Sequence, residues 1–244
     1  MSYFQDKVVW ITGATSGIGR ATAQMFAHGG ACIVLIARNA EQLEGTYEEI
    51  CHMGGHGCMA SVDVADRAAV QAMADKALGD YGRVDVLVNN AGTNVRERDI
   101  EHLTPEGWDN VVQVNLTGAF NMIHAALPAM RKQQDGLIVN VSSIAGQAVH
   151  TFTGAAYTAS KFGMTGMSLE LAEELWPQGI RMTALHPGEV NTPIMDRRPI
   201  PLSAEDRERM LQPQDVAETI RFLAQLDRRA SVPQMTLTPT HRRI

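Results

Sequence analysis

The stretch Val8-Val9-Trp10-Ile11-Thr12-Gly13-Ala14-Thr15-Ser16-Gly17-Ile18-Gly19 decides how the rest of the chain is interpreted. It starts as a short apolar run typical of a buried strand, passes through a glycine-rich turn and leads into a segment typical of a helix. Glycines at such a turn let the backbone approach a pyrophosphate, whose charge then faces the helix N-terminus. The spacing G-x-x-x-G-x-G is not the G-x-G-x-x-G form, so a purely structural turn is the alternative. We predict a dinucleotide cradle made by Gly13, Thr15, Ser16, Gly17, Ile18 and Gly19.

Short apolar runs recur along the chain, with longer amphipathic stretches between them. They predict strands over 8–11, 32–36, 84–88, 137–141 and 180–185, with weaker candidates at 58–62 and 234–237. The stretches between them predict helices over about 17–28, 41–53, 67–81, 106–133, 155–176 and 214–226. This alternation indicates an α/β fold with a doubly wound, mainly parallel, Rossmann-like sheet. No linker or repeat divides residues 1–244, so we expect a single domain.

Residues 192–213 depart from this alternation, because they are charged, punctuated by proline and weakly periodic. That composition favours a mobile flap over the substrate rather than a core element. Arg197 and Arg198 in this flap would suit an acidic substrate, and a solvated pair is the alternative.

The composition excludes several classes of protein. A net charge of −6 supplies no broad basic surface for nucleic acid or an anionic membrane. No apolar run reaches the roughly 18 residues of a membrane span, and the first residues lack a secretion signal, so we expect a cytoplasmic protein. The three cysteines are expected to be reduced thiols. Cysteine and histidine gather at 51–58, but their spacing fits no zinc-binding pair, and we predict no metal site.

Three further segments indicate where a dinucleotide would lie. Arg38 ends the second predicted strand, where a Rossmann-like fold meets the adenosine ribose, so a guanidinium is available for the 2′-phosphate of NADP. A solvated arginine is the alternative, and an acidic residue there would have indicated NAD. Asp63 and Val64 close the third strand, near the expected adenine. After the fourth strand come small and amide residues where a backbone passes close to the cofactor: Asn90, Ala91 and Gly92.

Tyr157 and Lys161 are four positions apart in a predicted helix, so their side chains share one face. Ser142 and Ser143 end the strand upstream, at the sheet edge where such folds bind ligands. A free phenol titrates near pH 10 and is a poor base at neutral pH, but a nearby cation lowers its pKa. Lys161 would supply that charge, together with an oxidised nicotinamide. This set of residues therefore predicts proton transfer by Tyr157.

With these motifs in order, the chain resembles the short-chain dehydrogenase/reductase family, in its single-domain branch of ~250 residues. The matching motifs lie between Lys7 and about Leu226: the turn at Thr12 to Gly19, Asn89-Asn90-Ala91-Gly92, Asn115, Ser143, Tyr157-x-x-x-Lys161, and Pro187-Gly188 with Thr192.

The resemblance implies a role for each matching residue. Tyr157 would be the general acid or base, and Ser143 would hold the substrate oxygen, with Ser142 as the competing serine. Lys161 would bind the nicotinamide ribose and lower the Tyr157 pKa, and Asn115 would hold a water in the proton relay. Near the nicotinamide the family places Pro187, Gly188, Val190 and Thr192. Ser143 precedes Tyr157 by one position more than is usual in the family, which indicates an insertion in the loop between them.

The resemblance also implies an assembly. The predicted helices at 106–133 and 155–176 are apolar on most of their circumference, so both sides need covering. The family often pairs these helices, and we expect a homotetramer or homodimer. The C-terminal residues lack the Val-Asp-Gly-Gly ending common in the family, which argues against a 3-oxoacyl thioester reductase.

The sequence therefore predicts an oxidoreductase that interconverts a ketone or aldehyde with an alcohol, using NADP(H) in preference to NAD(H). Its partner is a small carbonyl or alcohol substrate. One alternative is an NAD-dependent secondary-alcohol or hydroxysteroid dehydrogenase. Another is a regulatory protein that senses the cofactor and has lost turnover.

Overall fold

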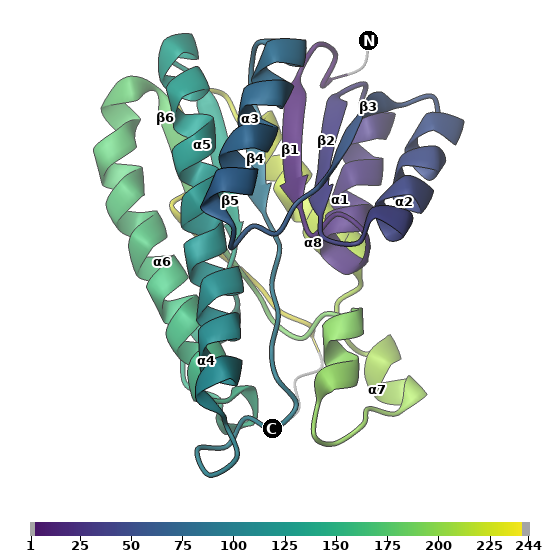
Figure 1. Cartoon of the computed structure of the whole chain (residues 1–244), viewed down its shortest axis with the longest axis vertical. Coiled ribbons are helices and arrows are strands. Elements are labelled where there is room, and N and C mark those ends of the chain that lie inside the picture. The colour runs from purple at the N-terminus through teal and green to yellow at the C-terminus, as the bar shows by residue number, and fades with distance from the viewer. Residues whose placement is uncertain (1–2, 241–244) are drawn as a thin grey trace.

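A seven-stranded parallel sheet runs through the middle of the computed structural model, which describes residues 3–240 (Figure 1). The strands lie in the order β3-β2-β1-β4-β5-β6-β7. Their bounds are β1 Val8–Thr12, β2 Cys32–Ala37, β3 His56–Ser61, β4 Val86–Asn89, β5 Gly136–Val141, β6 Ile180–Pro187 and β7 Gln234–Leu237. The predicted doubly wound, Rossmann-like α/β fold in a single domain is confirmed. The two weaker strand candidates are the two edges, β3 and β7, whose side chains are only partly covered.

Helices cover both faces of the sheet (Figure 1). One face carries α3 (Arg67–Tyr81), α5 (Gly118–Gln133) and α6 (Ala155–Leu175), and the other carries α1 (Gly17–His28), α2 (Ala40–His52) and α8 (Pro213–Gln225). A hydrophobic core lies on each face of the sheet, and alternate residues of β1 point into one or the other. Trp10 packs into the core on the α3 side and Ile11 into the core on the α1 side. A strand with helices on both faces must be apolar at every position, which explains the continuous apolar runs of the sequence.

The order of the strands reverses between β1 and β4. From β1 the chain builds outward to β2 and β3, and from β4 it builds the other way to β5, β6 and β7. In parallel sheets a crevice opens at this reversal, beyond the carboxyl ends of the strands. The glycine-rich turn after β1 and the asparagines after β4 therefore lie next to each other.

The helix predicted over 106–133 is interrupted. α4 (Pro105–Val112) is followed by a π-helical turn, η1 (Gln113–Thr117), before α5 begins. Gly118, at the start of α5, packs so closely on the loop between β3 and α3 that a Cβ there would lie 2.5 Å from Val64 Cγ2. The π turn holds Asn115 at its centre, and such turns are frequent at functional sites.

The segment 192–213 contains two short helices, η5 (Pro193–Arg197) and α7 (Ala204–Glu208). An isolated parallel bridge joins Val190 to Leu211, so the segment leaves the sheet and returns beside its own start. Across residues 3–240, no helix combines the length and the hydropathy that crossing a bilayer requires.

Candidate active site

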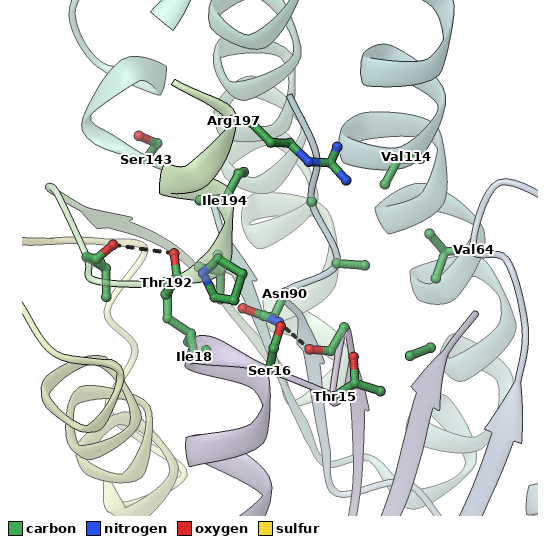
Figure 2. A pocket seen from close by; sticks show the side chains of 18 of the residues that line it. Thr15, Ser16, Ile18, Val64, Asn90, Val114, Ser143, Thr192, Ile194 and Arg197 are labelled. Atoms are coloured by element: carbon green, nitrogen blue, oxygen red, sulfur yellow. Dashed lines mark hydrogen bonds between the residues drawn. The ribbon is translucent and has the colours of Figure 1, made fainter. Parts of the chain in front are cut away.

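A cleft of about 530 Å³ lies at the crevice beyond the carboxyl ends of the strands (Figure 2). Its volume is in the range of small-molecule sites. Eighteen of the twenty residues that the sequence singled out line it: Gly13, Thr15, Ser16, Gly17, Ile18, Arg38, Asp63, Val64, Asn90, Ala91, Gly92, Ser143, Tyr157, Lys161, Pro187, Gly188, Val190 and Thr192. The other two, Gly19 and Asn115, are not lining residues. Gly19 packs against Gly13, and Asn115 hydrogen-bonds with Thr93 and Ser160.

The glycine-rich turn has the geometry of an anion cradle. Gly13 and Gly17 have φ of +64° and +50°, in the left-handed region that favours glycine. A Cβ on Gly19 would lie 2.2 Å from the Gly13 carbonyl oxygen, so only glycine lets the turn close. Ser16 is the N-cap of α1 but makes no side-chain capping bond, and the first turn of α1 holds no acidic residue. The first N–H groups of the helix are therefore free to receive a pyrophosphate, which this turn fits.

Asn90 and Thr12 brace the cradle from both sides of the reversal point. The Asn90 side-chain amide donates to the Thr12 carbonyl at 2.9 Å and to the Gly13 carbonyl at 3.2 Å. The Thr12 hydroxyl in turn accepts from the backbone N–H groups of Asn90 and Ala91, each at 2.9 Å. No sequence pattern indicated this role for Thr12, because only the pairing of β1 with β4 brings these residues together.

Arg38 lies at the far end of the cleft, beside the start of α2. Its guanidinium is 3.8 Å from the Asp63 carboxylate, and both side chains are exposed. An exposed pair of this kind contributes about 0–1 kcal/mol, so it does not hold Arg38 away from another anion. Asn39, also in the cleft wall, caps α2 by accepting from Gln42 N at 2.9 Å. This end of the cleft thus offers a cation that is only weakly paired, with Asp63, next to the N-terminus of α2.

Tyr157, Ser143 and Lys161 share one wall of the cleft. Burial raises the pKa of Tyr157 above its ordinary value, and hydrogen bonding by the Ser143 hydroxyl and the positive charge of Arg98 both oppose that rise. Lys161 Nζ lies 5.7 Å from the centre of the Tyr157 ring. Arg98, which no sequence motif indicated, therefore adds a positive charge that opposes the rise in the phenol pKa.

The two serines at the end of β5 face different ways. The Ser142 hydroxyl is buried against α6, where it donates to the Lys161 carbonyl at 3.1 Å and lies 3.1 Å from Thr165 Oγ1. Ser143 follows it at the rim of the cleft (Figure 2), and its hydroxyl accepts from Ala145 N at 3.1 Å. Both serines line the cleft, and Ser143 is the one whose hydroxyl hydrogen-bonds with Tyr157.

Lys161 is buried and its ammonium makes one hydrogen bond with oxygen, to the Val141 carbonyl at 2.8 Å. Burial lowers its pKa from 10.5 to about 8. An ammonium carries three donors, so those not used on Val141 remain for hydroxyl groups in the cleft. This donor set fits the ribose of a nicotinamide cofactor.

Asn115 holds the π turn against the segment after β4. Its side-chain amide donates to the Thr93 carbonyl and to Ser160 Oγ, each at 3.0 Å, and its Oδ1 accepts from Thr93 N at 2.7 Å. An amide oxygen accepts two hydrogen bonds, so Oδ1 retains one acceptor position.

The nicotinamide end of the cleft is supported by the edge strand β7. Pro187 pairs with Leu237, and Gly188 N donates to the Leu237 carbonyl at 2.8 Å. A Cβ on Gly188 would lie 3.0 Å from Pro239 Cδ, so the unusual C-terminal segment packs directly on this glycine. Thr192 covers the other side, against Gly17, where an added Cβ would lie 2.8 Å from Thr192 Cγ2.

His186 joins Thr12 and Arg98 as a residue near the site whose role no sequence motif indicated. It is fully buried in β6, and its Nδ1 lies 3.0 Å from the Ser143 carbonyl oxygen. Burial lowers the pKa of its imidazole. A neutral imidazole that donates to this carbonyl fixes the backbone beside the Ser143 hydroxyl. The signal in the sequence was weak, because a lone histidine within an apolar run is usually a core residue.

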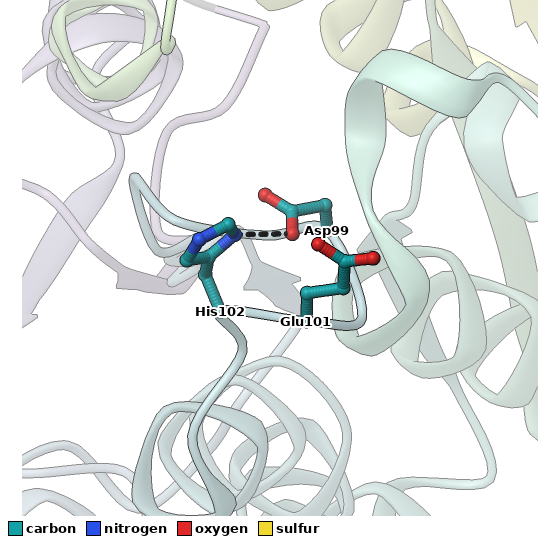
Figure 3. A group of neighbouring side chains, drawn as sticks. All are labelled: Asp99, Glu101 and His102. Atoms are coloured by element: carbon teal, nitrogen blue, oxygen red, sulfur yellow. Dashed lines mark hydrogen bonds and ion pairs between the residues drawn. The ribbon is translucent and has the colours of Figure 1, made fainter.

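Possible metal ligands gather at one place among the described residues, on the exposed loop before α4 (Figure 3). Asp99, Glu101 and His102 are all exposed there, and the His102 imidazole lies 2.6 Å from the Asp99 carboxylate. No three of the cysteines and histidines at 51–58 come within 4.8 Å of one another, because Cys51 and His52 end α2 while His56 and Cys58 lie in β3. None of these three residues lines the cleft, and exposed groups of this kind are common on protein surfaces without a metal ion.

Comparison with known proteins gives a consistent result. The sequence profile of the short chain dehydrogenase family matches residues 7–200. The 3-oxoacyl-(acyl-carrier-protein) reductase FabG of Thermotoga maritima is 38% identical over 226 residues, which cover 90% of this chain and 91% of that protein. A metagenomic short-chain oxidoreductase solved in complex with NADP aligns with a TM-score of 0.86 and 32% identity, covering 99% of this chain and 100% of the other. A short chain dehydrogenase from Mycobacterium paratuberculosis solved with NAD aligns with a TM-score of 0.85 and 28% identity, covering 96% of this chain and 97% of the other.

Proposed function

The chain belongs to the short-chain dehydrogenase/reductase family and is an NAD(P)-dependent oxidoreductase; from that premise we propose that it interconverts a ketone or aldehyde with an alcohol, using NADP(H) and Tyr157 as the general acid and base. The observation that carries the proposal is the convergence of Ser143, Tyr157 and Lys161 on one wall of a cleft whose floor is the glycine-rich turn.

The chain's own residues supply alignment and proton transfer. A bound nicotinamide cofactor supplies the hydride, with its two electrons, or accepts it in the reverse direction. Ser143 holds the substrate oxygen by a hydrogen bond, and Tyr157 gives that oxygen a proton during reduction or removes it during oxidation. Lys161 holds the ribose hydroxyl groups with the donors that Val141 leaves free.

Proton traffic to Tyr157 depends on the π turn. Asn115 keeps one acceptor position on Oδ1 beyond the Thr93 bond, which suits a water that links Lys161 to solvent. Asn115 is then a positioning residue that acts through the water and the turn rather than on the substrate.

Two observations favour NADP(H) over NAD(H). Arg38 offers a guanidinium at the adenosine end, and the N-terminus of α2 lies beside it. Asp63, whose carboxylate is exposed beside Arg38, would accept a hydrogen bond from the adenine amino group of either cofactor. A solved relative carries NADP and another carries NAD, so the choice rests on Arg38.

The experiment is a panel of carbonyl compounds and alcohols run with all four cofactor forms and followed by nicotinamide absorbance, with the Tyr157→Phe variant beside the wild type. We expect turnover with NADP(H), reduced by about 10²–10⁴-fold in the variant because the proton donor is gone. NADPH binding and the circular dichroism spectrum should stay as in the wild type.

Other outcomes select the alternatives. Turnover that survives Tyr157→Phe would remove the general-acid role. Tight cofactor binding without turnover on any substrate would indicate the regulatory alternative, and a strong NAD preference would indicate the NAD-dependent dehydrogenase.

The assembly and the flap complete the proposal. Phe120 of α5 and Phe162 of α6 are 40% and 42% exposed on the outer side of these helices, a face that suits pairing with a second copy into a homodimer or homotetramer.

Residues 192–213 would serve as the mobile flap that opens for substrate. The three free cysteines suit the reducing cytoplasm.

A further inference from the structure

A second, smaller cavity of about 80 Å³ adjoins the cleft at the reactive end. Ser143 and Tyr157 belong to the walls of both, so the smaller cavity begins where the substrate oxygen would be held. The part of the substrate that does not react would therefore extend from the reacting carbon into this smaller cavity. Its other charged walls are Arg98, Glu189 and Arg198.

Arg98 is a buried cation with no acidic partner. Its side chain is only 9% exposed, and the ion pairs of residues 3–240 do not include it. Three of its N–H groups donate to backbone carbonyls, of Arg96 at 3.4 Å, Phe152 at 3.3 Å, and Arg197. A guanidinium has five donors, so two remain. Buried charges are as a rule paired, because an isolated one is costly to desolvate.

Arg198 and Glu189 balance each other in the same cavity. Their side chains are mostly buried and form an ion pair at 2.5 Å, and the Arg198 guanidinium lies 5.1 Å from the centre of the Phe152 ring. The two arginines and the one glutamate leave one positive charge in excess, on Arg98. Burial and then the charge of Arg198 lower the Arg98 pKa, and a bound anion would favour the charged guanidinium against both effects.

We propose that the physiological substrate is an oxo acid, or the corresponding hydroxy acid, whose single carboxylate binds Arg98 while its carbonyl oxygen meets Ser143 and Tyr157. The inference rests on the proposed function, since it extends the same site. One excess charge suits a monoanion, and the fork of N–H groups suits the two oxygens of a carboxylate. The small volume of the cavity places the carboxylate a few carbon atoms from the reacting carbon.

The first test compares charged and neutral substrates on the wild-type enzyme. The 2-, 3- and 4-oxopentanoates and the methyl ester of each are reduced with NADPH, and kcat/KM is measured. We expect at least one acid to exceed its ester by tenfold or more, since a hydrogen bond to a charged group contributes about 1.5–3 kcal/mol. If every ester equals or exceeds its acid, the proposal is wrong, while the turnover itself still supports the proposed function.

The second test removes the charge. Arg98→Gln should collapse the acid-to-ester ratio toward one, because the carboxylate loses its partner whereas the ester never had it. Arg96→Gln is the matched control: it removes the same charge from the same loop, but Arg96 is exposed and outside the cavity. That variant should keep the wild-type ratio. A ratio that survives Arg98→Gln would overturn the proposal.

The third test needs neither turnover nor a variant. Pentanoate and pentanamide are titrated by calorimetry into the wild-type enzyme holding NADP⁺. We expect pentanoate to bind at least tenfold more tightly, and equal affinity would overturn the proposal. This measurement tests carboxylate binding in the cavity independently of turnover. A lack of turnover on every substrate would count against the proposed function instead.

Discussion

Lys161 is the residue at which burial and charge are in most direct conflict. It is 3% exposed, it donates to one backbone carbonyl, and among the described residues no carboxylate forms an ion pair with it. Its pKa of about 8 follows from that isolation, since burial disfavours the charged form. Part of the free enzyme therefore carries a neutral amine at pH 8.

Binding of NADP⁺ should therefore take up a proton at pH 8. Near its pKa Lys161 holds about half a proton in the free enzyme, and ribose hydroxyls that accept from the ammonium raise that pKa, so uptake of up to about half a proton is expected. The same linkage makes NADP⁺ affinity fall as the pH rises through about 8. Calorimetry in two buffers of different ionisation enthalpy measures the uptake.

This calorimetry is best done in the Tyr157→Phe background, so that the phenol cannot contribute protons. Adding Lys161→Met should abolish the uptake. Zero uptake, or proton release, before that second substitution would show that Lys161 does not hold the ribose as an ammonium.

Arg38 gives a separate prediction about cofactor choice. Arg38→Leu should raise KM for NADPH and lower the NADPH-to-NADH ratio of kcat/KM by about 10–100-fold, because charge-assisted bonds to the 2′-phosphate are lost. Arg20→Leu is the matched control, since Arg20 of α1 pairs with Glu49 of α2 and lies outside the cleft. An unchanged ratio in Arg38→Leu would mean that Arg38 is the solvated arginine of the alternative interpretation.

At the scale of elements, the contact between α1 and the turn after β1 is the tightest constraint on the cradle. Gly19→Ala would place a Cβ 2.2 Å from the Gly13 carbonyl oxygen, which is backbone and cannot rotate away. We expect a loss of about 1–3 kcal/mol in the free energy of unfolding and weaker cofactor binding, since the turn must open. Urea unfolding and a cofactor titration measure the two effects.

Gly45→Ala is the control for the same exchange in a helix. Gly45 lies inside α2 with nothing within 4 Å of the added Cβ, so the change should raise stability by about 0.4–1 kcal/mol. If Gly19→Ala behaved like Gly45→Ala, the turn would be less tightly closed than the structure indicates.

At the scale of the whole molecule, the layer that holds α4, α5 and α6 carries an exposed aromatic face. The double variant Phe120→Glu with Phe162→Glu should shift a homotetramer or homodimer toward smaller species, because charges would be buried without partners at the interface. Light scattering after size-exclusion chromatography measures the mass.

Phe222→Glu is the matched control for that experiment, since Phe222 is 48% exposed but lies on α8, in the opposite layer. It should leave the mass unchanged. A wild-type enzyme that is monomeric at micromolar concentration would remove the proposed assembly.

Much of the fold and of the cofactor cleft was readable from the residues alone. Apolar runs, turn glycines and helical spacing are local features, and they predicted the parallel sheet, the glycine-rich turn and the shared face of Tyr157 and Lys161. Two features of the structure could not be predicted from local sequence patterns. The π turn at Gln113–Thr117 leaves the apolar periodicity of its helix almost intact, and the roles of Ser142 and Ser143 depend on which neighbour each hydroxyl faces.

The sequence by itself therefore determined the sheet, the cradle and the residues proposed for proton transfer, because each depends on neighbours in the chain. The tertiary structure alone decided the surroundings of the phenol. Arg98 follows β4, Arg198 follows β6 and Tyr157 lies in α6, and they share a cavity only because parallel strands end at the same edge of the sheet. Charge and burial act through space rather than along the chain, so the place of Arg98 in the cavity beside Tyr157 had no signature in the sequence.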